Sequence, residues 1–230
     1  MSITQNLTQI RCRIEQACRQ VHRDPNAVSL LAVSKTKPVD AILAAYQGGQ
    51  TAFGENYVQE GVEKVQYFEQ QNISLEWHFI GPLQSNKTRV VAEHFDWVQT
   101  LDRIKIADRL NDQRPPHKAP LNVLIQINIS AENSKSGIQP QDMPALARYI
   151  TNLPHLRLRG LMAIPAATEN TALQEHTFNM MNELFRKLKA EFPVEQIDTL
   201  SIGMSDDMMS AVKCGSTMVR IGTAIFGKRN

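Results

Sequence analysis

The stretch SLLAVSKTKPVDAILAAYQGGQTAFGEN, residues 29–56, decides the fold class. An apolar run at 29–36 is followed by a helical pattern at 38–47 and by a second apolar run at 51–56. A strand, a helix and a second strand in this order indicate a parallel sheet that is covered on its outer face. The turn after the first strand reads SKTKPVD and lacks the Gly-x-Gly-x-x-Gly pattern of a doubly wound nucleotide-binding sheet. We therefore favour a barrel over the doubly wound sheet, which is the competing architecture.

The strand and helix unit repeats to the end of the chain. Eight apolar runs predict strands, and an amphipathic helix with Ser2 and Gln5 in capping-box spacing precedes the first of them. No linker or low-complexity tract divides the chain, so we predict one α/β domain over residues 1–230, a single (β/α)8 TIM barrel with an extra N-terminal helix. The predicted strands are 29–36, 51–56, 76–81, 97–102, 121–130, 156–164, 199–205 and 217–227, and the predicted helices between them are 38–47, 57–69, 84–94, 103–111, 140–152, 172–191 and 206–214.

The composition is that of an ordinary globular protein. With 25 Lys and Arg against 23 Asp and Glu, the formal net charge is +2, which argues against sequence-independent binding of nucleic acid. No run approaches the roughly 20 apolar residues of a membrane-spanning helix, and the N-terminus lacks a signal peptide, so we expect a cytoplasmic protein. Cys12, Cys18 and Cys214 have the spacing of neither a disulfide framework nor a zinc site, and we interpret them as small apolar residues.

Lys35 is the first candidate functional residue. In a barrel, functional groups lie at the carboxyl ends of the strands and in the loops that follow, and Lys35 comes at the end of the first strand. Burial disfavours a charged ammonium, which makes the neutral amine available for Schiff-base chemistry with a carbonyl. A lysine that reaches solvent or binds a substrate carboxylate fits the position equally well. The position alone leaves both interpretations open.

The last two strands supply a candidate anion site. Residues 201–207 read SIGMSDD, where a turn leads into a helix predicted to begin at Asp206, and residues 219–223 read VRIGT. Backbone N–H groups and hydroxyls converge at such positions, and barrels often bind phosphate with the loops after the seventh and eighth strands. Each glycine alone is better explained by a tight turn, but their joint occurrence here favours a phosphate site. The candidate residues are Gly203, Ser205, Gly222 and Thr223, with Arg220 beside them.

A lysine after the first strand and a phosphate cradle after the last two suit a ligand with an aldehyde at one end and a phosphate at the other. Pyridoxal 5′-phosphate is such a ligand. Asn56 and His78 lie on the same predicted rim, although a lone strand histidine between Trp77 and Phe79 is more often a core residue with satisfied hydrogen bonds. Candidates for a second or transfer site are Lys37, Lys87 and Lys135.

These residues resemble those of a known family. The chain is similar to the pyridoxal phosphate homeostasis proteins of the YggS/PROSC type, in runs that extend from the first strand to the C-terminus. The resemblance implies a single barrel related to the N-terminal domain of alanine racemase, of fold type III, with pyridoxal 5′-phosphate held as an internal aldimine. The matching runs are AVSKTKP (32–38), FGENYVQE (53–60), EWHFIGPLQSNK (76–87), LRGLMAIP (158–165), IGMSDDMMSAV (202–212) and GSTMVRIGTAIFG (215–227).

The same resemblance assigns roles to individual residues. Lys35 would be the Schiff-base lysine, and Asn56 would lie near the ring hydroxyl of the cofactor. Arg220 would contact the cofactor at its phosphate or at its pyridine nitrogen, and an arginine at that nitrogen would leave the ring a weak electron sink for carbanion chemistry. Phosphate binding would fall to Ser205, Gly222 and Thr223.

The resemblance implies control of the intracellular supply of pyridoxal phosphate, with effects on amino-acid and keto-acid pools, rather than an established reaction. Racemisation needs proton donors and acceptors on both faces of the substrate carbon, and in the related racemases the second group is a tyrosine from a further C-terminal domain of the partner subunit. The chain ends at Asn230, just after the eighth predicted strand, so we expect that domain to be absent. We predict a monomeric cofactor carrier without efficient catalysis, with pyridoxal-phosphate-dependent apo-enzymes as recipients.

Two alternatives stay open at this point. A barrel-only amino-acid racemase dependent on pyridoxal phosphate would use Lys35 as one base and His78 or Tyr57 as the other. A scaffold that binds partner proteins through its surface would not need Lys35 for its cellular role.

Overall fold

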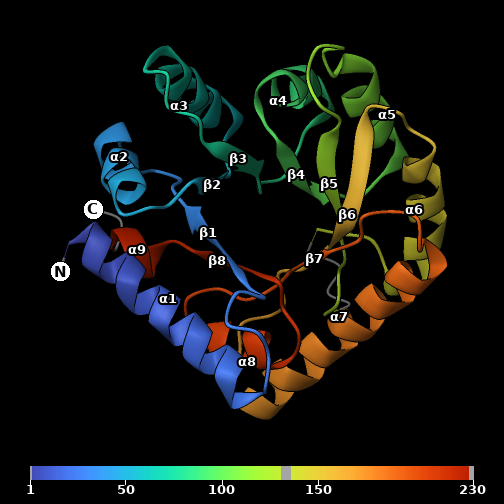
Figure 1. Ribbon diagram of the computed structural model, residues 1–230. Helices are drawn as coiled ribbons and strands as arrows, with labels where there is room; N and C mark the ends of the chain where they lie inside the picture. The colour runs from blue at the N-terminus through green and yellow to red at the C-terminus, as the bar shows by residue number, and fades with distance from the viewer. Residues whose placement is uncertain (1, 131–135, 228–230) are drawn as a thin grey trace.

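Eight parallel strands form a closed barrel (Figure 1). They are β1 (Ser29–Val33), β2 (Ala52–Glu55), β3 (Glu76–Phe79), β4 (Trp97–Leu101), β5 (Leu121–Gln126), β6 (Leu156–Met162), β7 (Thr199–Ser201) and β8 (Met218–Ile221). The computed structural model describes residues 2–130 and 136–227. Each strand pairs with the next, and β8 pairs with β1 to complete the ring. This topology confirms the predicted (β/α)8 barrel and excludes the doubly wound sheet, whose strands do not close.

Helices surround the barrel and cover its outer face (Figure 1). They are α1 (Ile3–Gln20), α2 (Val39–Gln47), α3 (Val58–Gln70), α4 (Thr88–His94), α5 (Ile104–Gln113), α6 (Met143–Thr151), α7 (Thr171–Glu191), α8 (Met208–Lys213) and α9 (Thr223–Phe226), with short 3₁₀ turns η1 (Ser85–Lys87) and η2 (Pro140–Asp142). Among the described residues, none of these helices is both long and apolar enough to cross a membrane.

Helix α1 lies outside the repeat and contacts α2, α8 and α9, so it covers the place where the last strand meets the first. The predicted capping box is confirmed, because the Ser2 hydroxyl accepts the Gln5 amide and the Gln5 side chain accepts the Ser2 amide. The Asn6 side chain donates to the Ile225 carbonyl at 2.8 Å, which ties the start of the chain to α9. The extra N-terminal helix therefore helps to fix the segment that follows β8.

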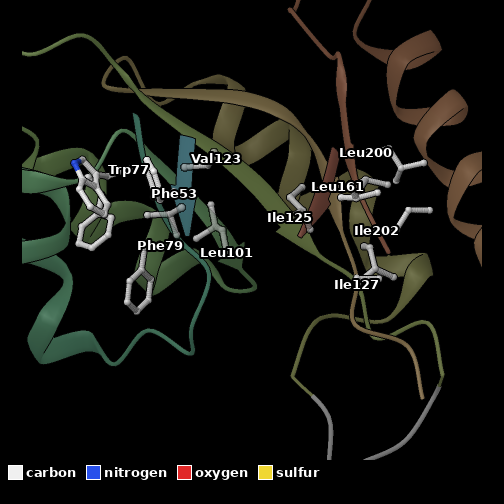
Figure 2. Close-up of a cluster of buried hydrophobic side chains, with 14 of the residues drawn as sticks. Phe53, Trp77, Phe79, Leu101, Val123, Ile125, Ile127, Leu161, Leu200 and Ile202 are labelled. Atoms are coloured by element: carbon white, nitrogen blue, oxygen red, sulfur yellow. The ribbon is translucent and has the colours of Figure 1, made fainter. Parts of the chain in front are cut away.

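The main hydrophobic core lies between the strands and the helices. Successive side chains of a strand point to opposite faces, so Trp77 and Phe79 of β3 face outwards together. Trp77 packs against Phe68 of α3 with ring centroids 6.0 Å apart, and Phe79 packs against Phe95 after α4 at 5.5 Å. Figure 2 shows strand and strand-end residues of this core: Phe53, Trp77, Phe79, Leu101, Val123, Ile125, Ile127, Leu161, Leu200 and Ile202.

The interior of the barrel mixes apolar and polar side chains. The Ser201 hydroxyl of β7 donates to the Gln99 side chain of β4 at 2.7 Å. These strands are not neighbours in the sheet, so this hydrogen bond crosses the barrel. Two small apolar groups, separate from the main core, fill more of the interior: Leu31, Ile80 and Met218, and Trp97, Leu124 and Met162.

Several element boundaries differ from the prediction, and the largest difference affects the last strand. β8 ends at Ile221, and residues 223–226 form α9 instead of continuing the strand to 227. A short apolar run such as TAIF fits a strand or a helix, so its pattern does not decide between them. The predicted helix at 206–214 is confirmed as α8, although it begins only at Met208.

The cysteines differ in exposure. Cys18 and Cys214 are buried, as predicted for small apolar residues. Cys12 is also a free cysteine, but it is exposed. At the helical period, residue 12 lies on the face of α1 opposite the buried Ile10 and Ile14, so it points away from the core.

Candidate functional site

The turn after β1 carries Lys35. Ser34 is buried, Lys35 is half-buried and Thr36 is exposed. Thr36 has a φ of 62°, in the left-handed region that β-branched residues rarely adopt. Its amide donates to Glu60 Oε1 of α3 at 2.6 Å, and this hydrogen bond helps to hold the unusual conformation. Lys35 therefore lies at the carboxyl end of β1, as predicted, in a constrained turn.

A group of buried charges supports this turn, and no sequence motif predicted it. Lys64 Nζ of α3 donates to the Ser34 carbonyl at 2.8 Å, to Glu55 Oε1 at 2.8 Å and to Glu60 Oε1 at 2.6 Å. The Ser34 hydroxyl also donates to Glu55 Oε1 at 2.6 Å. Burial raises the pKa of Glu55, and the Lys64 ammonium opposes that shift. We name Ser34, Glu55, Glu60 and Lys64 the Lys64 cluster.

Asn56 follows β2 and presents an unpaired acceptor. Its Oδ1 atom is buried and has no hydrogen-bond partner among the described residues. The backbone is tightly packed here, because a Cβ added to Gly81 after β3 would lie 2.0 Å from the Asn56 carbonyl oxygen. A buried acceptor without a donor costs free energy, so this side chain suits a ligand that brings a hydroxyl or N–H group.

The segment between β7 and α8 contains two of the predicted residues. Gly203 has a φ of 98°, and a Cβ added there would lie 2.5 Å from the Ala211 Cβ, so the position requires glycine. Its carbonyl accepts the Arg220 amide at 3.0 Å. Ser205 is half-buried, and its hydroxyl makes no hydrogen bond to a described residue. Gly203 thus shapes the turn, whereas Ser205 has a hydroxyl available to a ligand.

Arg220 is buried inside the barrel. Its Nη1 donates to the Ser201 carbonyl at 2.8 Å and to the Ser201 hydroxyl at 2.7 Å, and its Nη2 donates to the Ala163 carbonyl at 2.9 Å. Burial lowers the pKa of Arg220 to about 10, and Asp207 opposes this shift. At neutral pH the guanidinium therefore keeps its charge, held at the carboxyl ends of β6 and β7.

The end of β8 lies against the end of β1. A Cβ added to Gly222 would lie 3.2 Å from the Val33 carbonyl oxygen, so the two backbones approach closely. Thr223 is exposed and begins α9 rather than ending a strand. Lys37 Nζ donates to the Gly227 carbonyl at 3.2 Å, which joins the turn after β1 to the end of α9. The structure therefore brings the Lys35 turn and the segment after β8 together.

His78 lies apart from this group, in the core role that was its alternative interpretation. Its ring is fully buried and stacks on Trp97 with centroids 4.9 Å apart. One ring nitrogen pairs with Gln99 at 2.9 Å and the other with Glu76 at 2.8 Å. Glu76 is the first residue of β3, so the ring is tied towards the amino end of the strand. Both nitrogens have partners within the protein. The expected contact between His78 and the cofactor stays a prediction.

The three candidate transfer lysines occupy different surroundings. Lys37 is half-buried beside the Lys35 turn, and Lys87 is exposed in η1. Lys135 lies outside the described residues.

A separate cavity of about 610 Å³ opens at the other end of the barrel. Most of the strand residues that line it are the first residues of their strands, among them Ser29 of β1, Glu76 of β3 and Trp97 of β4. Barrel enzymes place their chemistry at the carboxyl ends. The cavity is therefore not the site that the Lys35 turn indicates.

Comparison with known proteins identifies the family. The family described as alanine racemase, N-terminal domain, matches residues 5–230. The pyridoxal phosphate homeostasis protein of Haemophilus influenzae is 73% identical over 230 residues, which are 100% of this chain and 97% of the relative. The chain belongs to the pyridoxal phosphate homeostasis protein family. The resemblance that the sequence motifs suggested is thereby confirmed.

Two solved structures agree with this assignment. PipY from Synechococcus elongatus, with PLP bound, has a TM-score of 0.84 and 32% sequence identity, over 98% of this chain and 100% of that chain. Alanine racemase from Corynebacterium glutamicum has a TM-score of 0.68 and 18% identity, over 99% of this chain and 61% of that chain. The second likeness concerns the fold alone, and it confirms a barrel of the alanine racemase N-terminal type.

Proposed function

We propose that the chain binds pyridoxal 5′-phosphate through Lys35 and acts in homeostasis of that cofactor as a carrier. The observation that carries the proposal is the convergence of the Lys35 turn, the unpaired Asn56 oxygen and the segments after β7 and β8 at one end of the barrel. The family name and the PLP-bound relative support the choice of ligand. When bound, this cofactor supplies an aldehyde, which condenses with a lysine amine and releases water.

The residues at this end of the barrel fit such a ligand. Asn56 Oδ1 needs a donor, which a ring hydroxyl provides. Ser205 and Thr223 offer hydroxyls to a phosphate, and Gly222 keeps the backbone between β8 and β1 free of a side chain. Arg220 uses only part of its N–H groups on Ser201 and Ala163, so it keeps donors for either a phosphate or a ring nitrogen.

Two features favour a carrier over the alternative racemase. A guanidinium with a pKa of about 10 donates a hydrogen bond at neutral pH without giving up its proton, so Arg220 would not protonate a pyridine nitrogen. His78, one of the two residues considered as a second base, has both ring nitrogens occupied in the core. Tyr57, the other residue considered as a second base, lies at the start of α3 and is 52% exposed. Incubation with single-enantiomer amino acids tests this point, because sustained loss of optical rotation would favour the racemase.

A labelling experiment tests the binding residue. We expect added pyridoxal phosphate to give a new absorption band, and borohydride reduction followed by peptide mapping to place the label on Lys35. Lys35→Ala should lose the band, and Lys37→Ala, which changes the same residue type two positions away, should keep it. A label confined to another lysine would refute the assignment. Full cellular function of Lys35→Ala would instead favour the protein scaffold.

The partners and the setting are part of the proposal. We propose a monomer that works in the cytoplasm and delivers the cofactor to apo-enzymes that depend on pyridoxal phosphate. Mixing the loaded protein with such an apo-enzyme, in the presence of a phosphatase that destroys free cofactor, should restore enzyme activity. Light scattering of the purified protein tests whether it is a monomer.

A further inference from the structure

We propose that the Lys64 cluster positions the amine of Lys35, with Glu60 as a positioning residue. This inference rests on the proposed function, because it concerns the lysine assigned there to the cofactor. The residues on both sides of Lys35 are held by the cluster: Ser34 through its carbonyl and hydroxyl, and Thr36 through its amide. The backbone that carries Lys35 is therefore anchored to α3 before and after that residue.

The Lys64 ammonium at the centre of the cluster is fully paired. An ammonium carries three N–H groups, and Lys64 has an acceptor for each of them: the Ser34 carbonyl, Glu55 Oε1 and Glu60 Oε1. The distances of 2.6 to 2.8 Å are those of charge-assisted hydrogen bonds. The side chains of Lys64 and Glu55 are 6% and 0% exposed, so water competes little for the bond between these two. Such a group resists displacement and transmits little backbone motion to the turn.

The strained residue lies at the point where the cluster holds the turn. Thr36 is one of the few described non-glycine residues with a positive φ, and its amide is bound by Glu60. A left-handed β-branched residue is unfavourable and persists only where its surroundings impose it. Glu60 is also fixed from the other side by Lys64, so its carboxylate joins the ammonium to the turn. The geometry thus fixes the direction in which residue 35 leaves β1.

Stability alone is a weaker explanation. Buried ion pairs add little net stability compared with apolar side chains of similar volume. A binding group, in contrast, gains from being held in its productive geometry before the ligand arrives. A structural role predicts that changes in the cluster lower stability only. A positioning role predicts that they also slow the reaction at Lys35 in protein that is still folded.

Substitutions at Glu60 separate the two roles. Glu60→Ala removes the acceptor from Thr36 and Lys64, whereas Glu60→Gln keeps an acceptor oxygen at the same place and loses only the charge. Glu63→Ala is the matched control, because it removes the same charge from the same helix, and the bond it loses joins Glu63 to Gln59 rather than to the turn. The three variants and the wild type are loaded with pyridoxal phosphate and followed by stopped-flow absorption. Borohydride labelling then gives the share of label on Lys35.

We expect Glu60→Ala to slow adduct formation about tenfold, the order expected from losing the hydrogen bond that holds the turn, from the Thr36 amide to the charged Glu60 carboxylate. The share of label on Lys35 should fall in favour of other lysines. Glu60→Gln should restore the rate to within about threefold of the wild type, and Glu63→Ala should match the wild type. An unchanged rate and label in folded Glu60→Ala would overturn the inference, as would equal impairment of Glu60→Gln and Glu60→Ala.

A second variant covers the case in which Glu60→Ala does not fold. Ser34→Ala removes the hydroxyl bond to Glu55 and leaves the ion pairs of Lys64 in place, so it loosens the other side of the turn. We expect it to slow adduct formation, and a wild-type rate would overturn the inference. The lysine that carries the label in the wild type separates the positioning role from the proposed function. A label on Lys35 with unchanged cluster variants removes the positioning role alone, and a wild-type label elsewhere removes the proposed function as well.

Discussion

Replacing Lys64 with methionine tests the energetics of the buried charges. Glu55 is 0% exposed, its Oε1 is bound by Lys64 and Ser34, and its Oε2 has no hydrogen-bond partner among the described residues. Removing one partner of a buried ion pair costs about 3–5 kcal/mol. The pair with Glu60 adds little, because that carboxylate is 28% exposed and partly screened. We expect the free energy of unfolding of Lys64→Met to lie about 3–5 kcal/mol below that of the wild type at a pH of about 8.

The deficit should depend on pH in a defined direction. Burial raises the pKa of Glu55, and Lys64 opposes the shift, so without the ammonium the pKa of Glu55 rises further. A carboxyl whose folded-state pKa lies above its unfolded value stabilises the fold below the unfolded pKa. It loses that contribution as the pH rises through the folded pKa. The deficit of Lys64→Met relative to the wild type should therefore shrink as the pH falls from about 8 to about 5.

Urea unfolding followed by circular dichroism measures both effects. Adding Glu55→Gln to Lys64→Met removes the unpaired charge, so the double variant should be more stable than Lys64→Met at the higher pH. Contacting residues of this kind couple by about 0.5–3 kcal/mol in a double-mutant cycle. A deficit below about 1 kcal/mol, a deficit that does not change with pH, or additive effects in the cycle would refute the reasoning.

Three further predictions concern single residues at or near the site. Gly203→Ala should lower the melting temperature, by the equivalent of about 1–3 kcal/mol, because φ is 98° and the new Cβ would meet Ala211 at 2.5 Å. Asn56→Ala should leave the apo-protein as stable as the wild type or more so, since Oδ1 is already unpaired. The same variant should lower the affinity for pyridoxal phosphate about tenfold, as measured by spectrophotometric titration. His78→Leu should destabilise the fold by about 1–3 kcal/mol in urea, by leaving the buried Gln99 donor unpaired, and keep the affinity for the cofactor within about threefold. A large loss of affinity in folded His78→Leu would instead support the predicted contact between His78 and the cofactor.

The alternation of strands and helices allowed the architecture to be predicted from the sequence. Parallel strands buried on both faces are nearly continuous in apolar residues, as in SLLAV of β1, and each is followed by a segment with helical spacing. The exact ends of elements are set by tertiary contacts. β8 stops at Ile221 because Gly222 packs on the end of β1 and the chain then turns into α9. Helix α9 is in turn held by Asn6, a residue from the opposite end of the sequence.

The candidate site could be predicted only where topology determines it. The carboxyl ends of adjacent strands meet by construction, so Lys35 and the segment after β8 were expected to be neighbours. The role of Lys64 had no such signal. A glutamate and a lysine four residues apart in a helix, such as Glu60 and Lys64, usually indicate an ion pair on the solvated surface. The burial of Lys64 depends instead on contacts with Ser34 and Glu55, which lie 30 and 9 residues away in the sequence.

The placement of His78 shows why alternation gives the face of a residue but not its role. Successive strand residues alternate between the core and the barrel interior, so a polar residue at position 78 had to point inwards. Inside, the chain of hydrogen bonds runs from His78 to Gln99, from Gln99 to Ser201, and from Ser201 to Arg220. Each of these polar groups is buried, and each is satisfied by the next. These hydrogen bonds help to hold the Arg220 guanidinium at the carboxyl ends of β6 and β7. A buried charge needs such polar partners, which explains why the barrel interior is polar. His78 contributes to holding Arg220 indirectly, through Gln99 and Ser201.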